Sequence, residues 1–198
     1  MAQSVVGICN LALTRLGQKP ITSLEDGTDT AQICAKNYDS ARLAMLRAYP
    51  WSFAKKRIKL PALEAAPVFG WKYAYQLPAD HVWTVQIGDL REDDECEIPW
   101  AIEGKTLVTD EGAPLPMLYI RDEQDPVKFN ADFVDALADQ LAGEMAFSIT
   151  KDIRHMKPFL EKALLKAQSG RSRDSQESSH DSLGADTLID VRHSGVSR

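Results

Sequence analysis

The sequence predicts a mainly α-helical α+β protein: a helical bundle that carries a small antiparallel sheet and a flexible C-terminal tail. Apolar residues recur with a helical period over residues 4–49 and again over 130–169. Between these regions the helical period fades, and short β-like runs separated by turn residues contain all four tryptophans. The last 28 residues are rich in Ser, Asp and Gly. We therefore expect a bundle core at 1–50 and 128–170, a β-rich insertion at 51–127, and an extended or disordered tail at 171–198.

Two amphipathic helices are expected at the N-terminus. The first covers about Ser4 to Leu16 and precedes Gly17, a residue suited to a helix C-terminus. The second covers about Thr30 to Ala48, since Pro50 disfavours a helical conformation at the residue before it. The predicted apolar stripes are Val5, Ile8, Cys9, Ala12, Leu13 and Leu16 in the first helix, and Ala31, Cys34, Ala35, Tyr38, Arg42, Met45 and Tyr49 in the second.

The middle region predicts one small antiparallel sheet, because its runs are short and are bounded by Gly, Pro and Asp. The expected strands are Trp51–Leu60, Trp71–Gln76, Val82–Ile87, Trp100–Ile102, Thr106–Thr109 and Leu115–Arg121.

Helical periodicity returns at about Asn130 and continues to Ile149, and a further helix is expected from about Asp152 to Ser169. Pro158 either kinks this last helix or opens its second half. The tail that follows should be disordered on its own. Its short apolar segment, with Leu188, Ile189 and Val191, could add as a strand to a partner.

Composition narrows the function classes. The net charge of -6 argues against a protein that coats DNA, which normally presents a basic patch. No apolar run approaches the roughly 18 residues of a membrane span, and the N-terminus lacks the pattern of a signal peptide, so we expect synthesis in the cytoplasm and no membrane partner. Three widely spaced cysteines do not indicate a disulfide framework.

The residue types that carry chemistry do not form a recognisable active site. Cys9 and Cys34 lie on the apolar stripes and are expected to be core residues, while the acidic neighbours of Cys96 disfavour its thiolate. The histidines show no metal-binding spacing, and there is no glycine-rich phosphate loop or nucleophile elbow. We expect no enzyme activity, cofactor or metal. A hydrolase acting through Asp80 and His81 remains a distant alternative.

Two charged runs are candidate interface segments. The basic run contains Lys55, Lys56, Arg57 and Lys59, and the acidic run contains Glu92, Asp93, Asp94 and Glu95. Strand alternation puts Lys55, Arg57 and Lys59 on one face, and Lys56 on the other with Ile58 and Leu60. Because the whole chain is acidic, a solvated face or an ion-pair surface between subunits is favoured over nucleic-acid binding with Trp51 and Phe53.

The N-terminal block resembles the tail tubular protein A family of short-tailed phages, which are head-to-tail adaptor proteins. The matching residues, in order, are Asn10–Leu13, Leu16-Gly17, Ile21–Leu24, Ala31–Tyr38, Arg42, Tyr49–Ala54 with Lys56-Arg57, and Tyr75–Asp80. The likeness is sharp over about residues 7–80 and extends in layout over about 4–170.

The resemblance implies a structural virion protein at the head–tail junction. Such proteins form a twelve-subunit ring between the portal protein and the tail nozzle protein, and double-stranded DNA passes through the central channel. The interface candidates within this sequence are the two charged runs and the tail residues Leu188, Ile189 and Val191. Another head-completion or tail-tube protein is the first alternative, and a single-stranded nucleic-acid binder is a further one.

Overall fold

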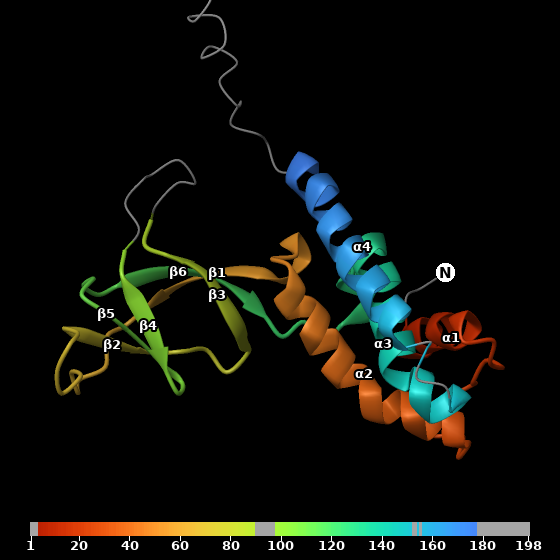
Figure 1. Cartoon of the computed structure of the whole chain (residues 1–198). Helices are drawn as coiled ribbons and strands as arrows, with labels where there is room; N and C mark the ends of the chain where they lie inside the picture. The colour runs from red at the N-terminus through yellow and green to blue at the C-terminus, as the bar shows by residue number, and fades with distance from the viewer. Residues whose placement is uncertain (1–3, 90–97, 152–153, 155, 178–198) are drawn as a thin grey trace, which may run out of the picture.

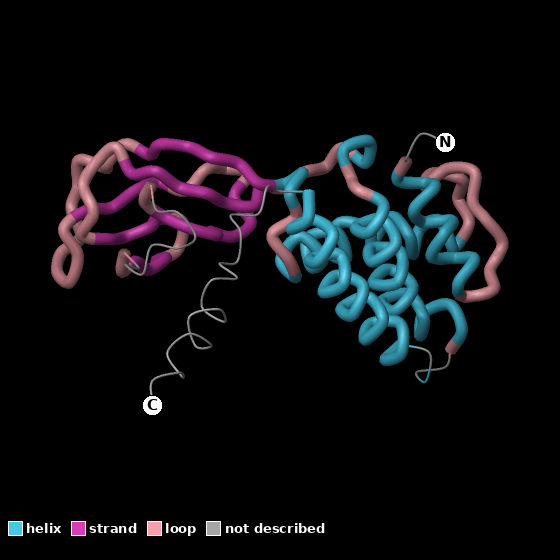
Figure 2. The backbone as a smooth tube through the Cα atoms, turned by 90° about the horizontal axis from the view of Figure 1, so that it is seen from above, coloured by secondary structure: helices cyan, strands magenta, loops and turns pink. Residues whose placement is uncertain are grey.

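The structure is a computed structural model, and it describes all residues except 1–3, 90–97, 152–153, 155 and 178–198. Four helices form a bundle: α1 (Val5–Arg15), α2 (Asp29–Ala48), α3 (Ala131–Thr150) and α4 (Met156–Glu177). Among the described residues, six strands lie between α2 and α3 in the chain and form a separate β part beside the bundle (Figure 1). The predicted fold class, a helical bundle with a β insertion, is confirmed. Viewed from above, the β part and the bundle lie end to end (Figure 2).

The helix ends follow from local capping. The side chains of Ser4, Thr28 and Asn130 accept hydrogen bonds from the backbone N–H groups of Gly7, Ala31 and Phe133, which would otherwise lack partners in the first turn. Gly17 follows α1 with a positive φ of 69°, a conformation that glycine adopts without steric cost.

The strands form two three-stranded antiparallel sheets, so the prediction of one sheet is wrong. The first sheet has the order β1 (Lys55–Leu60), β6 (Leu115–Arg121), β3 (His81–Ile87). The second has the order β2 (Tyr73–Gln76), β5 (Thr106–Thr109), β4 (Trp100–Glu103). Two sheets form because each has apolar residues that are buried only when the sheets pack together. The shared cluster is Leu60, Tyr75, Leu77, Ile87, Leu107, Leu115, Met117 and Tyr119.

Several predicted boundaries also need correction. Residues Ser52–Ala54 form a 3-10 helix, η1, and not the start of a strand. The last helix begins at Met156, which places Pro158 in its first turn, where a proline costs no hydrogen bond within the helix. That helix continues past Gly170 to Glu177. In α2, Ala35 is exposed, while Ala41 and Leu46 are buried.

An aromatic cluster fills the bundle beside the β part. The Trp51 side chain is fully buried, and its ring lies edge-on to Phe133 at a centroid distance of 5.1 Å. Phe53 and Phe129 complete the cluster, each within 5.5 Å of another ring of the group. The Trp51 indole N–H donates to the Met45 carbonyl at 2.9 Å, so its one polar group is also satisfied. This cluster ties the end of α2 to the start of α3.

Candidate functional site: the junction and the exposed surfaces

The junction between bundle and β part is built on a buried arginine. Arg42 lies on α2 with 2% exposure, and its guanidinium pairs with the Asp122 carboxylate just after β6. The same guanidinium donates to the main-chain carbonyl of Glu123 at 2.9 Å. A second tie lies nearby, where the indole N–H of Trp83 on β3 donates to the Leu46 carbonyl at 3.1 Å. Both ties join a strand or its end to α2, and they fix the β part against the bundle.

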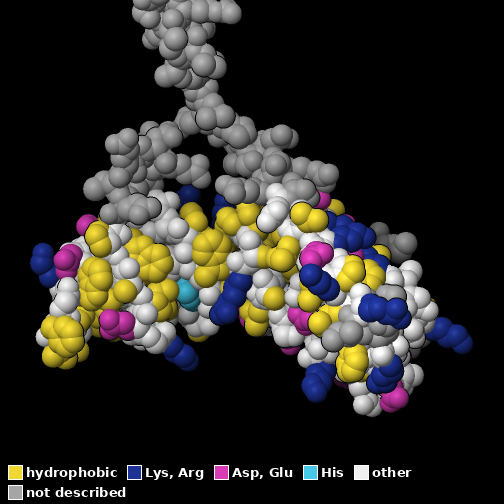
Figure 3. Space-filling view, viewed as in Figure 1, with side chains coloured by type: hydrophobic (Ala, Val, Ile, Leu, Met, Phe, Trp, Pro, Cys, Tyr) yellow, Lys and Arg dark blue, Asp and Glu magenta, His cyan; other side chains and the backbone are white. Residues whose placement is uncertain are grey.

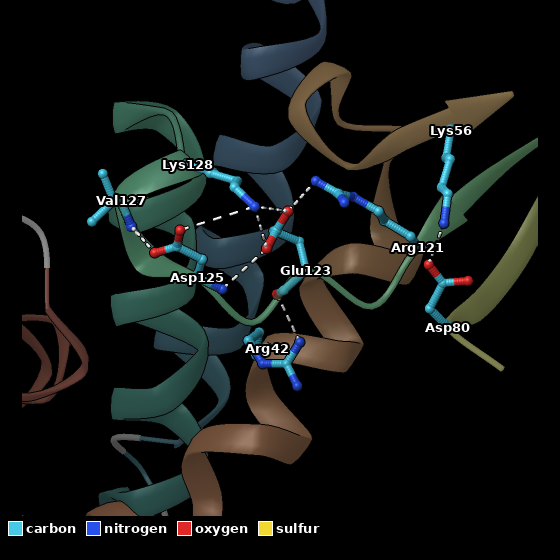
Figure 4. Close-up of polar contacts among 8 residues, drawn as sticks. All are labelled: Arg42, Lys56, Asp80, Arg121, Glu123, Asp125, Val127 and Lys128. Atoms are coloured by element: carbon cyan, nitrogen blue, oxygen red, sulfur yellow. Dashed lines mark hydrogen bonds and ion pairs between the residues drawn. The ribbon is translucent and has the colours of Figure 1, made fainter.

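A cluster of ion pairs around Glu123 also lies at the junction (Figure 4). Together with the contacts of Arg42 it forms the junction network. Glu123 is only 6% exposed. Its carboxylate forms ion pairs with Arg121 on one side and with Lys128 on the other, where the Lys128 ammonium lies 3.2 Å away. The Asp125 backbone N–H also donates to it, at 3.1 Å. Two cations and one N–H group therefore offset the cost of burying this carboxylate. These contacts stabilise the connection from β6 to α3.

The Asp122 carboxylate of the junction makes stability depend on pH. Burial alone would raise the pKa of Asp122, but the hydrogen bonds from Arg42 and Gln124 outweigh it and lower that pKa. A carboxyl whose folded pKa lies below its unfolded value of about 3.9 adds stability above that pH and loses it as the pH falls further. We expect the free energy of unfolding to decrease below about pH 4. Urea denaturation at pH 6 and pH 3 measures this, and Asp122→Asn should show a smaller pH-dependent loss; an equal loss would contradict the assignment to Asp122.

Asp80 and His81, the residues of the hydrolase alternative, lie at the start of β3. The Asp80 carboxylate accepts from Lys56 at 2.9 Å and from the Tyr119 hydroxyl at 2.8 Å (Figure 4 draws the pair with Lys56). His81 instead lies 2.9 Å from the Thr84 hydroxyl, and its ring stacks on Tyr119. Burial lowers the pKa of His81, despite the opposing charge of Asp80. The Asp80 carboxylate therefore binds Lys56 and Tyr119, and it does not orient the His81 imidazole as an acid–base pair requires.

A second buried charge cluster holds α1, α3 and α4 together. The Asp139 side chain is fully buried, and its carboxylate lies 2.7 Å from Arg15 and 2.5 Å from Lys166. Asp135, one turn earlier in α3, pairs with the same two cations, and their attraction lowers its pKa although burial alone would raise it. Cys9 and Cys34 are free thiols and are buried as predicted, and the hydrogen bond between the two thiols together with burial raises the pKa of Cys9. Within the described ranges, no group of His, Cys, Asp or Glu has the arrangement of a metal site.

The predicted interface residues separate into three groups. Lys55, Arg57 and Lys59 are exposed on β1, whereas Lys56 pairs with Asp80 of the same chain, so the structure confirms that the basic run divides between two faces. A pocket of about 300 Å³ lies at the end of the basic face, lined by Arg57, Lys59, Asp89 and Leu118 among others. The acidic residues Glu92, Asp93, Asp94 and Glu95 and the tail residues Leu188, Ile189 and Val191 lie outside the described residues.

Sequence reasoning missed an apolar surface on the β part. Figure 3 shows hydrophobic side chains gathered over this part of the molecule. Val68 and Phe69 are 95% and 86% exposed in the loop between β1 and β2, which Figure 1 places at the end away from the bundle. We call the exposed apolar residues of this part the distal surface: Leu63, Val68, Phe69, Tyr73, Trp100 and Ile102. The sequence does contain a sign of this surface, because Val68 and Phe69 are adjacent apolar residues in a turn-rich loop, where polar residues are usual.

No model of a known protein family matches the chain, and a search of curated proteins finds no match either.

Among the helices that the structure describes, none is long and apolar enough to cross a membrane.

Proposed function

We propose that this chain is a structural virion protein that forms a ring-shaped head-to-tail adaptor between a portal protein and a tail nozzle protein. The observation that carries the proposal is the distal surface. Six large apolar side chains are exposed on the β part, and Figure 3 shows hydrophobic side chains gathered over it, as is common where a protein contacts another protein. The bundle with its β insertion also has the layout that the resemblance to the tail tubular protein A family implies.

The geometry suits a contact between unlike surfaces of neighbouring subunits. A ring needs a head-to-tail interface in which one patch meets a different patch on the next copy. The bundle presents a second set of exposed apolar residues, Phe147, Leu164 and Leu165, on α3 and α4. The distal surface of one copy would meet a different surface of its neighbour, and the junction network would hold the two parts at a fixed angle. The twelve-subunit stoichiometry is taken from the resemblance.

The net charge fits a channel through which DNA moves. An acidic protein repels phosphates and offers few sites of adhesion, provided that its acidic groups face the lumen. Binding of single-stranded nucleic acid is disfavoured, because Trp51, one of its two stacking residues, is fully buried. Another head-completion or tail-tube protein remains the alternative, and it would place the same ring elsewhere in the particle.

The distal surface can be tested with a pair of substitutions. We expect the double variant Val68→Ser, Phe69→Ser to abolish ring formation on the portal. At each contact between subunits, the loss of the Phe69 side chain alone would remove about 1.5–3 kcal/mol of binding free energy. The free energy of unfolding should change by less than about 0.5 kcal/mol, since both side chains are exposed. Mass photometry of the chain mixed with the portal protein of the same genome measures assembly.

Val127→Ser is the matched control, because Val127 is 71% exposed but lies by the junction between β6 and α3. It should assemble as the unchanged protein does. Normal rings in the Val68→Ser, Phe69→Ser variant would contradict a role of the distal surface in assembly.

A further inference from the structure

The edge of the first sheet is open at β1. Within the described part of the chain, β1 pairs with β6 alone, so its second edge offers unpaired backbone groups. Open edges recruit additional strands, and proteins commonly cover them. Four lysine and arginine side chains line this strand, and they are exposed. The edge therefore favours a strand that carries acidic residues.

The C-terminal segment 186–191 has the matching pattern. Its sequence is Asp-Thr-Leu-Ile-Asp-Val, in which Asp186, Leu188 and Asp190 share one face of an extended chain and Thr187, Ile189 and Val191 share the other. Strand β1 divides in the same way. Lys55, Arg57 and Lys59 lie on its outer face, and Ile58 and Leu60 lie on the side that packs in the sandwich.

The length and position of the tail agree with this pairing. Helix α4 ends at Glu177, and Figures 1 and 2 place that end on the side of the bundle that faces the junction. Residues 178–185 supply eight residues, enough to span up to about 28 Å when extended. Strand β1 begins at the junction and runs away from the bundle (Figure 1). A tail that leaves α4 and continues outward would run parallel to it.

We propose that residues 186–191 of the chain's own tail add to the free edge of β1 as a parallel strand. In this register Asp186 lies opposite Lys55 and Asp190 lies opposite Lys59. On the inner face Ile189 lies opposite Ile58 and Val191 opposite Leu60, which extends the apolar side of the sheet. Leu188 packs along the aliphatic stem of Arg57. The first sheet then has four strands, the outer backbone groups of β1 gain hydrogen-bonding partners, and Lys55 and Lys59 gain opposite charges. This inference does not depend on the proposed adaptor function.

Paired cysteines in the full-length chain test the contact and its register. Each variant carries Cys96→Ser, which removes the native cysteine outside the described residues. The parallel register predicts disulfides in Lys55→Cys with Asp186→Cys and in Lys59→Cys with Asp190→Cys, because cross-strand neighbours lie close enough to bridge. The exchanged pairs, Lys55→Cys with Asp190→Cys and Lys59→Cys with Asp186→Cys, report an antiparallel register. Lys36→Cys with Asp186→Cys is the background control, since Lys36 is exposed on α2.

Intact mass and peptide mapping under non-reducing conditions give the result. We expect disulfides within one chain in the two parallel pairs, at least tenfold above the Lys36→Cys control. Yields equal to that control, predominance of the exchanged pairs, or disulfides that join two chains would each overturn the proposal.

Hydrogen exchange gives an independent readout without cysteines. The outward amides of β1 should exchange about tenfold faster in Asp186→Lys with Asp190→Lys, because the added strand is lost. Reversing the partners as well, with Lys55→Asp and Lys59→Asp, should restore slow exchange. Equal exchange in the unchanged protein and in the first variant would overturn the proposal.

Discussion

Replacing Trp51 with alanine is expected to lower the free energy of unfolding by about 4 kcal/mol. The side chain is fully buried, and it contacts Tyr49, Phe53 and Phe133 in the aromatic cluster. Its removal leaves a cavity that the close-packed ends of α2 and α3 cannot fill, and it leaves the Met45 carbonyl without the indole donor. Urea denaturation followed by circular dichroism measures the loss.

Trp100→Ala is the matched control for this prediction. Trp100 lies on β4 with 38% exposure, so the same truncation should remove much less buried area. We expect a loss of about 1 kcal/mol or less. Similar losses in the two variants would show that the aromatic cluster is not a main source of stability.

Arg42→Met is expected to destabilise the protein by about 3 kcal/mol, because it removes one partner of a buried ion pair and leaves the other. Asp122 would lose its guanidinium, and the Glu123 carbonyl would lose a donor in a buried setting. Methionine retains much of the apolar stem, so the loss reports mainly the charge and hydrogen bonds. Chemical denaturation measures it, and the midpoint of unfolding should shift to a lower urea concentration.

A double-mutant cycle identifies the cause of that loss. If the cost arises from the unpaired carboxylate, Asp122→Asn in the Arg42→Met background should cost little more than Arg42→Met alone. Lys36→Ala, on an exposed position of the same helix, should change stability by less than about 0.5 kcal/mol. Additive losses from Arg42→Met and Asp122→Asn would contradict direct coupling across the junction.

The sequence predicts the helices well because their signals are local. Ser4, Thr28 and Asn130 cap helices at or beside the positions where periodicity begins, and Pro50 follows the end of α2. Strands β5 and β6 also begin and end at the predicted residues. Alternation further predicts that Lys56 lies on a different face from Lys55 and Arg57, and its bond to Asp80 agrees with that division.

The features that sequence reasoning missed depend on contacts between distant residues. The division into two sheets follows from β1 pairing with β6, which begins more than fifty residues later, and local patterns do not encode that choice. Periodicity predicts that Arg42 lies on the buried stripe of α2, but its partner Asp122 lies 80 positions further along the chain, where no local pattern identifies it. Helix α4 extends beyond Gly170 into a polar stretch that composition alone assigned to the tail.

The most direct test of the adaptor proposal is cryo-electron microscopy of this chain mixed with the portal protein encoded in the same genome. We expect a closed ring of this chain on one end of the portal, with the distal surface buried at a protein–protein contact and an open central channel. An intact portal that carries no ring of this chain, at concentrations where both proteins are folded, would contradict the adaptor function.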